Sequence, residues 1–150
     1  MISSAGPVRK HPVRKVPHKR WYTRAELVAM AEYYAVKYGL KPKVMKAQIS
    51  TESSWNTTAV SRVWARDRKG RLLLRNGKPY KVPCAYGIAQ FTPATGKSYG
   101  LNGTKDLFNP HKSLDAMGRM MSARVNTFKR AGDSDDVAHA KALSMYNGGR

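Results

Sequence analysis

Acidic residues are scarce in this chain. Only nine of its 150 residues are Asp or Glu, three of them glutamates, against 28 Lys and Arg, so the formal net charge at pH 7 is +19. A single cysteine, Cys84, excludes an internal disulfide framework. The four histidines are scattered and show no metal-ligand spacing, so we expect neither a metal nor a cofactor.

Long apolar runs are also missing. The longest candidate, residues 27–36, is interrupted by Glu32 and is too short to cross a membrane. The first residues lack the apolar centre of a secretory signal. We therefore expect a soluble protein with no transmembrane segment, either made in the cytoplasm or already stripped of a signal.

The positive charge is concentrated in two segments. Residues 1–24 hold seven Lys and Arg and no acid, and residues 62–84 hold eight with Asp67 as the one acid. Together they supply +14 of the +19, a field that favours nucleic acid, anionic lipid, lipopolysaccharide or an anionic cell-wall polymer as partner. The alternative is a solvated tail and a solvated hairpin that only keep the protein soluble.

Length and composition favour one domain with a basic extension. Residues 1–20 are rich in Pro, Lys, Arg and His and predict a flexible basic arm, which leaves residues 21–150 as the folded domain. Within this domain, residues 62–84 form a basic insertion. Asn76-Gly77 predicts a hairpin turn there, flanked by strands at residues 71–75 and 78–82.

The rest of the domain carries helix signals. A capping box at Thr23 and Glu26 begins a helix that ends at Gly39, and Pro42 begins a second one. A long helix is expected after Pro110 and a last one from the acidic residues that follow Gly132. The predicted fold class is mainly α (α+β), with a small β-hairpin insertion.

One acid stands at the end of an apolar helical stripe. Glu52 follows Met45 by seven residues, Gln48 by four and Ile49 by three, which are offsets that share one helix face. A carboxylic acid in an apolar setting has a raised pKa and can stay protonated, ready to protonate a glycosidic oxygen and then act as a base. The alternative is an ordinary glutamate that ends a helix in solvent.

Further motifs follow Glu52 in a fixed order. Glu52-Ser53 is followed by Trp55-Asn56 and by an Ala-x-Ser element at residues 59–61. Residues 87–90 read Gly-Ile-Ala-Gln with Pro-Ala-Thr at 93–95, and residues 145–147 read Met-Tyr-Asn. Taken in this order, the set resembles the lytic transglycosylase (soluble lytic transglycosylase-like) family of peptidoglycan-cleaving enzymes.

The resemblance implies a lysozyme-like fold whose cleft binds alternating N-acetylglucosamine and N-acetylmuramic acid. It implies that Glu52 is the sole catalytic acid/base and that Ser53 supports it. It also implies substrate contacts from Ser61, Gln90, Tyr146 and Asn147 and from the backbone around Ile88 and Ala89. Two simpler roles stay open: Tyr146 as an ordinary core tyrosine and Ser53 as a helix cap.

The scarcity of acids suits a transglycosylase, which closes a 1,6-anhydro ring on the muramic sugar without a second carboxylate. A hydrolytic muramidase on the same fold, assisted by an aspartate, is the first alternative. A basic nucleic-acid-binding protein is the second, although no nucleic-acid motif supports it, and we expect no specific nucleic-acid partner.

Two departures from the family pattern concern the insertion and the end of the chain. The insertion at 62–84 separates motifs that family members keep close together, and we interpret it as a basic flap that contacts lipopolysaccharide or other anionic envelope material. The chain stops at Arg150, where relatives continue, which fits an excised domain or a partner that supplies the missing packing.

The biological setting is also an expectation. High basicity without a signal fits a monomeric, phage-encoded enzyme, either an endolysin or a virion component. Such an enzyme resides in the host cytoplasm or the virion and acts on the periplasmic cell wall.

Overall fold

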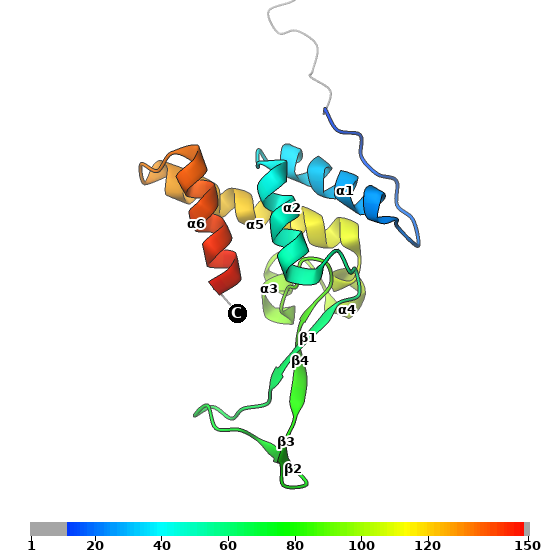
Figure 1. The fold of residues 1–150 in the computed structure, drawn as a ribbon, viewed down its shortest axis with the longest axis vertical. Coiled ribbons are helices and arrows are strands. Elements are labelled where there is room, and N and C mark those ends of the chain that lie inside the picture. Colours follow the sequence, from blue (N-terminus) through cyan, green and yellow to red (C-terminus); the bar gives the residue numbers. More distant parts are fainter. Residues whose placement is uncertain (1–11, 149–150) are drawn as a thin grey trace, which may run out of the picture.

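The computed structural model describes the backbone of residues 12–148 and the side chains of residues 12–146. This part of the chain is mainly helical and carries a small antiparallel ribbon (Figure 1), as the sequence predicted. In chain order the elements are α1 (Arg24–Lys37), α2 (Pro42–Ser53), β1 (Val60–Trp64), β2 (Leu74–Arg75), β3 (Lys78–Pro79), β4 (Lys81–Tyr86), α3 (Pro93–Ser98), α4 (Gly103–Leu107), α5 (Pro110–Arg130) and α6 (Asp135–Gly148).

Local sequence signals set the helix ends. At the start of α1 the hydroxyl of Thr23 accepts a hydrogen bond from the Glu26 amide, and the Glu26 carboxylate accepts one from the Thr23 amide. This reciprocal pair confirms the predicted capping box. Pro42 and Pro110 stand in the first turns of α2 and α5, where a missing amide proton costs nothing.

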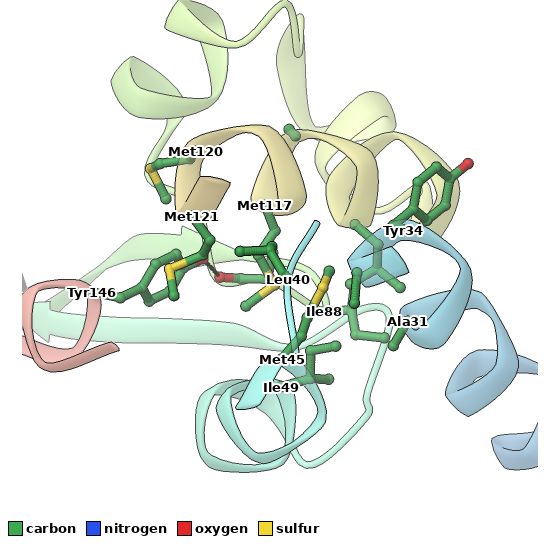
Figure 2. Close-up of a cluster of buried hydrophobic side chains, with 14 of the residues drawn as sticks. Ala31, Tyr34, Leu40, Met45, Ile49, Ile88, Met117, Met120, Met121 and Tyr146 are labelled. Carbon is green, nitrogen blue, oxygen red and sulfur yellow. Dashed lines mark hydrogen bonds between the residues drawn. The ribbon is translucent and has the colours of Figure 1, made fainter. Parts of the chain in front are cut away.

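Helix α5 lies at the centre of the core. Its Met117 and Met121 are fully buried, as are Met45 and Ile49 of α2. Figure 2 shows Ile88, from the turn after β4, among these side chains. The face of α2 that ends in Glu52 is therefore fixed against α5 and against the 87–90 turn.

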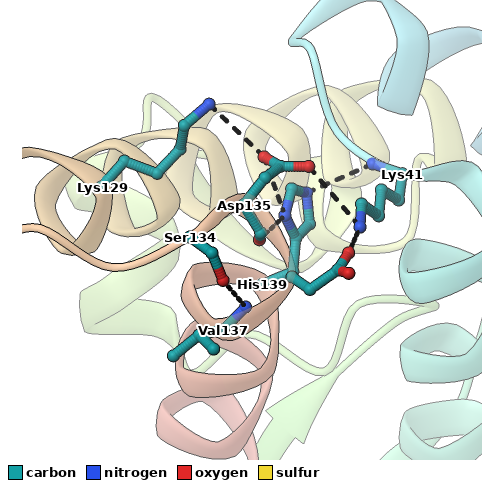
Figure 3. A network of polar contacts seen from close by, with 7 residues as sticks. Lys41, Lys129, Ser134, Asp135, Val137 and His139 are labelled. Carbon is teal, nitrogen blue, oxygen red and sulfur yellow. Dashed lines mark hydrogen bonds and ion pairs between the residues drawn. The ribbon is translucent and has the colours of Figure 1, made fainter.

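A polar network fixes the start of α6 (Figure 3). His139 is buried; its Nδ1 lies 2.9 Å from the Asp135 carbonyl oxygen, and its Nε2 accepts a hydrogen bond of 3.3 Å from the Lys41 amide. The Asp135 carboxylate pairs with Lys41 at 3.5 Å and with Lys129 at 3.4 Å. These contacts tie α6 to the end of α5 and to the residue before α2. They thereby set the direction in which α6 carries Tyr146 toward the 87–90 turn.

The basic insertion forms a two-stranded ribbon that extends away from the helices (Figure 1). Strands β2 and β3 meet around Asn76 and Gly77, whose φ angles of 53° and 77° suit the predicted tight hairpin turn. The predicted strand boundaries were wrong, because the second flank divides between β3 and β4 and β4 pairs with the unpredicted β1. All five residues of β1 are exposed, so no alternation of apolar and polar residues marked this strand.

The predicted basic arm lies partly outside the described residues. In residues 12–20 the side chain of Val16 is buried in the core cluster, and the rings of His18 and His111 lie 4.1 Å apart between centroids. This part of the arm therefore packs on the helices, and the flexibility predicted for residues 1–20 stays a prediction for the rest of the arm.

Candidate active site

Glu52 lies in the last turn of α2. Met45, Gln48 and Ile49, on the same helix face, are all buried. The Glu52 carboxylate oxygen Oε1 is buried, while the side chain as a whole is only partly so. After Glu52 the helix ends at Ser54 and Trp55, which take left-handed φ angles of 51° and 68°. The chain thus reverses immediately beyond the acid, leaving it at the end of the core-facing stripe that the sequence predicted.

The turn at residues 87–90 lies against this end of α2. Gly87 has φ of 83°, and a Cβ added there would lie 2.0 Å from the Leu107 carbonyl oxygen, so only glycine fits. The hydroxyl of Ser53 donates to the Ile88 carbonyl at 2.8 Å. Ser53 therefore links the residue next to Glu52 directly to the turn, which is more than a helix cap would do.

Tyr146 reaches the same turn from α6. Its hydroxyl donates to the carbonyl of Ala89, and its ring is buried (Figure 2). Burial raises the pKa of this hydroxyl above its ordinary value of 10.0, so it stays a donor well above neutral pH. Ser53 and Tyr146 thus hold two successive carbonyls, those of Ile88 and Ala89, from two different helices.

Gln90 completes the attachment of the turn. Its side chain is only 3% exposed, and its amide nitrogen donates to the Ala59 carbonyl at 3.1 Å and to the Gly87 carbonyl at 2.9 Å. The amide oxygen accepts a hydrogen bond from the hydroxyl of Ser61. Both amide protons are therefore used within the protein, and Gln90 connects the turn to the start of β1.

The structure thus brings Ser53, Ser61, Ile88, Ala89, Gln90 and Tyr146 together at the end of α2 that carries Glu52. Asn147 follows Tyr146 in α6, but its side chain lies outside the described part. Its contact with substrate stays a prediction, as do the substrate contacts of the other six residues.

A small, open pocket lies beside the turn. It is lined by Gln90, Phe91, Thr92, Thr95, Met120, Arg124, Met145 and Tyr146. Glu52 is not among these described lining residues. The pocket shares Gln90 with the turn, and Ser53, next to Glu52, bonds to Ile88 of the same turn. Sequence reasoning missed Arg124 and Met120, because no local motif marks residues that a helix turns toward a pocket. Thr95 stands in the Pro-Ala-Thr element but was not named as a site residue.

The other carboxylates form ion pairs with lysines or arginines. All nine acids of the chain lie within the described residues, and each of the eight besides Glu52 forms an ion pair with Lys or Arg. Asp106, for example, accepts hydrogen bonds from the Asn102 amide and from the Lys112 ammonium, which together lower its pKa. None of the eight lines the pocket beside the turn.

A family model decides the identity of this arrangement. The model described as Transglycosylase SLT domain matches residues 29–150, a range that contains Glu52, the 87–90 turn and Tyr146. The chain belongs to the SLT transglycosylase family. It is therefore a peptidoglycan lytic transglycosylase of the lysozyme-like superfamily.

Two further searches add no relative. No curated protein and no solved structure matches the chain. Within residues 12–148, no group of three or more His, Cys, Asp or Glu is placed to hold a metal ion. No helix in the same range is long and apolar enough to cross a membrane.

Proposed function

We propose that this SLT transglycosylase cleaves the β-1,4 bond between N-acetylmuramic acid and N-acetylglucosamine and leaves a 1,6-anhydromuramic end. The observation that carries the proposal is the position of Glu52 beside the 87–90 turn, which Ser53 and Tyr146 hold. Glu52 stands at the motif-bearing end of α2. The other eight acids stand outside the motifs, and each pairs with Lys or Arg. A mechanism with one acid/base therefore suits this chain.

In this reaction protonated Glu52 gives its proton to the glycosidic oxygen, and the bond from that oxygen to C1 of the muramic sugar breaks. The N-acetylglucosamine leaves with a free 4-hydroxyl. The acetamido oxygen of the muramic sugar stabilises the positive charge at C1. The Glu52 carboxylate then takes the proton of the C6 hydroxyl, and O6 bonds to C1, so no water is consumed and the acid is regenerated.

The neighbouring residues act by positioning. Ser53 and Tyr146 hold the carbonyls of Ile88 and Ala89, and Gln90 holds the turn to β1. Glu52 ends the helix face on which Met45 and Ile49 are buried, and its own Oε1 is buried too. A site held from three sides suits a reaction that depends on fixed geometry.

A hydrolytic muramidase is the competing reaction on the same fold. It would need a second group to activate water, and retaining or inverting glycosidases supply this as a carboxylate. In this chain that carboxylate would have to leave an ion pair, since the eight acids other than Glu52 are all paired. The transglycosylase reaction needs no carboxylate besides Glu52.

Replacement of the acid tests its role. Glu52→Gln keeps the size and polarity of the side chain but removes the transferable proton, so wall cleavage should fall at least about 100-fold. Glu32→Gln is the matched control. Glu32 lies on α1, and its carboxylate pairs with Lys46 of α2. Turbidity loss of purified peptidoglycan measures both variants, with circular dichroism confirming their fold. Full activity of Glu52→Gln would refute the assignment.

We further propose that the ribbon from β1 to β4 binds anionic envelope material, with lipopolysaccharide as the ligand. Residues 62–84 carry a net charge of +7, and the ribbon extends from the helical body (Figure 1). It also exposes large apolar side chains: Val60, Val63, Trp64, Leu72, Leu73 and Leu74. Cationic and apolar groups on one protruding element suit a ligand that combines phosphates with acyl chains.

The ribbon's charges can be removed without touching the site. Arg75→Gln together with Lys78→Gln should weaken binding to lipopolysaccharide by about 1 kcal/mol per charge at low salt. Cleavage of purified peptidoglycan should not change. Lys43→Gln, on the exposed side of α2, is the control. Equal binding of lipopolysaccharide by wild type, the double variant and Lys43→Gln would contradict the proposal.

The phage setting, the monomeric state and the location in virion or host cytoplasm stay predictions. Detection of the protein in purified virions would separate a virion component from a lysis enzyme.

A further inference from the structure

Arg124 on α5 lies at the junction of two hollows. The first is the pocket beside the 87–90 turn, where Gln90 and Tyr146 contribute to the wall. The second is an apolar hollow between Tyr99 and Phe128. Arg124 contributes to both, so one cationic side chain stands between a pocket of mixed polarity and an apolar one.

The guanidinium of Arg124 contacts the ring of Tyr146, but one of its nitrogens has no hydrogen-bond acceptor in the described part of the chain. Its central carbon lies 5.8 Å from the centroid of the Tyr146 ring, within the range of a cation–π contact. Its Nη1 atom is buried, and no residue in the described part of the chain accepts a hydrogen bond from it. A buried N–H of a charged group without an acceptor is unfavourable. A rotation of the side chain that brings this N–H to an acceptor in either hollow removes that cost.

The position of Arg124 relates it to the catalytic acid. Met121, one helical turn earlier on α5, contacts the buried amide of Gln48 at 3.5 Å, and Gln48 precedes Glu52 by one turn of α2. The ring that Arg124 faces belongs to Tyr146, which holds the turn beside Glu52. Arg124 therefore stands on the side of the site that Tyr146 and the 87–90 turn form.

We propose that Arg124 binds a carboxylate of the peptide stem carried by the muramic sugars of peptidoglycan. This proposal rests on the function proposed above and assigns the substrate class more narrowly. A planar guanidinium binds a carboxylate through two parallel hydrogen bonds, which a neutral sugar does not offer. The apolar hollow between Tyr99 and Phe128 receives the alkyl side chains of the stem. Arg124 is thus a specificity residue that favours stem-bearing glycan over bare glycan.

The test compares two substrates and four proteins. The substrates are glycan strands with their peptide stems and the same strands stripped of stems by an amidase. The proteins are wild type, Arg124→Gln and Arg124→Lys; Arg130→Gln on the exposed end of α5 is the control. Arg124→Gln should raise KM for stem-bearing strands about 10-fold or more, with kcat retained, and leave cleavage of stripped strands unchanged. Arg124→Lys keeps the charge but cannot form the two parallel hydrogen bonds. Its KM for stem-bearing strands should lie between those of wild type and Arg124→Gln.

Equilibrium binding separates this proposal from the proposed reaction. A disaccharide with its stem and the same disaccharide without it are titrated calorimetrically into wild type and Arg124→Gln. Stem-dependent binding that Arg124→Gln loses would support the proposal even if the products proved hydrolytic. An equal effect of Arg124→Gln on both ligands, or no effect on either, would overturn it.

Discussion

Replacing Tyr146 by Phe removes one atom that joins α6 to the turn beside Glu52. The Tyr146 hydroxyl donates to the Ala89 carbonyl, while the ring fills a buried position against Phe91, at 6.4 Å between centroids. Phenylalanine keeps that ring, so the change creates no large cavity. The Ala89 carbonyl, in a residue that is 0% exposed, loses this donor.

The size of the effect follows from that geometry. A buried polar group left without its partner costs about 1–3 kcal/mol, so the free energy of unfolding should fall by about that amount. For a chain of this length the corresponding fall in Tm is about 2–12 °C. The activity should also fall, because the 87–90 turn is held less firmly against the end of α2 that carries Glu52.

Tyr80→Phe is the matched control for thermal and urea unfolding. Tyr80 lies on the ribbon, and its hydroxyl makes no hydrogen bond to another residue in the described part of the chain, so its loss should change Tm little. If Tyr146→Phe unfolds at the wild-type temperature and cleaves peptidoglycan at the wild-type rate, the proposed attachment of α6 to the turn is wrong.

Three further changes probe the same fold. Gly87→Ala should destabilise the protein far more than Gly100→Ala in thermal unfolding, since both positions have φ of 83° but only at Gly87 would the Cβ overlap a backbone atom. Gln90→Glu should lower both Tm and activity, because a carboxylate cannot donate to the two carbonyls that the amide now holds. Burial, with the nearby charge of His18, lowers the pKa of His111 below 6.5, so the folded state binds fewer protons than the unfolded state as the pH falls through 6.5. The free energy of unfolding should therefore decrease with acidification below 6.5, and His111→Gln should flatten that slope in urea titrations.

Each of the three has an outcome that would contradict it. Equal Tm values for the two glycine variants would mean that the turn shifts away from Leu107 without cost. Wild-type behaviour of Gln90→Glu would mean that the amide's donors are dispensable. An unchanged slope in His111→Gln would assign the pH dependence to other groups.

The four long helices were readable from the sequence because their ends carry local chemistry. Thr23 and Glu26 satisfy each other's amides, and Pro42 and Pro110 take positions that need no amide proton. The stripe through Met45 and Ile49 needed only helical periodicity. Strand β1 carried no such signal, since all its residues are exposed and its partner follows about twenty residues later.

The site was readable only as far as its motifs extend. Glu52, the 87–90 turn and Tyr146 stand in motifs whose order could be recognised, and the structure brings them together. The sequence did not reveal that the side-chain amide of Gln90 donates hydrogen bonds to the carbonyls of Ala59 and Gly87. Such facts depend on which distant segments meet, and no pattern within one segment encodes that.

The most direct test of the central proposal is the identity of the released products. Purified peptidoglycan is digested in water enriched in heavy oxygen, with wild type beside Glu52→Gln, and the muropeptides are weighed by mass spectrometry. The account predicts wild-type products one water lighter than hydrolysis products and without heavy oxygen, and none from the variant. Reducing-end products that carry heavy oxygen would contradict it, because they would show that water, and not the muramic C6 hydroxyl, attacks C1.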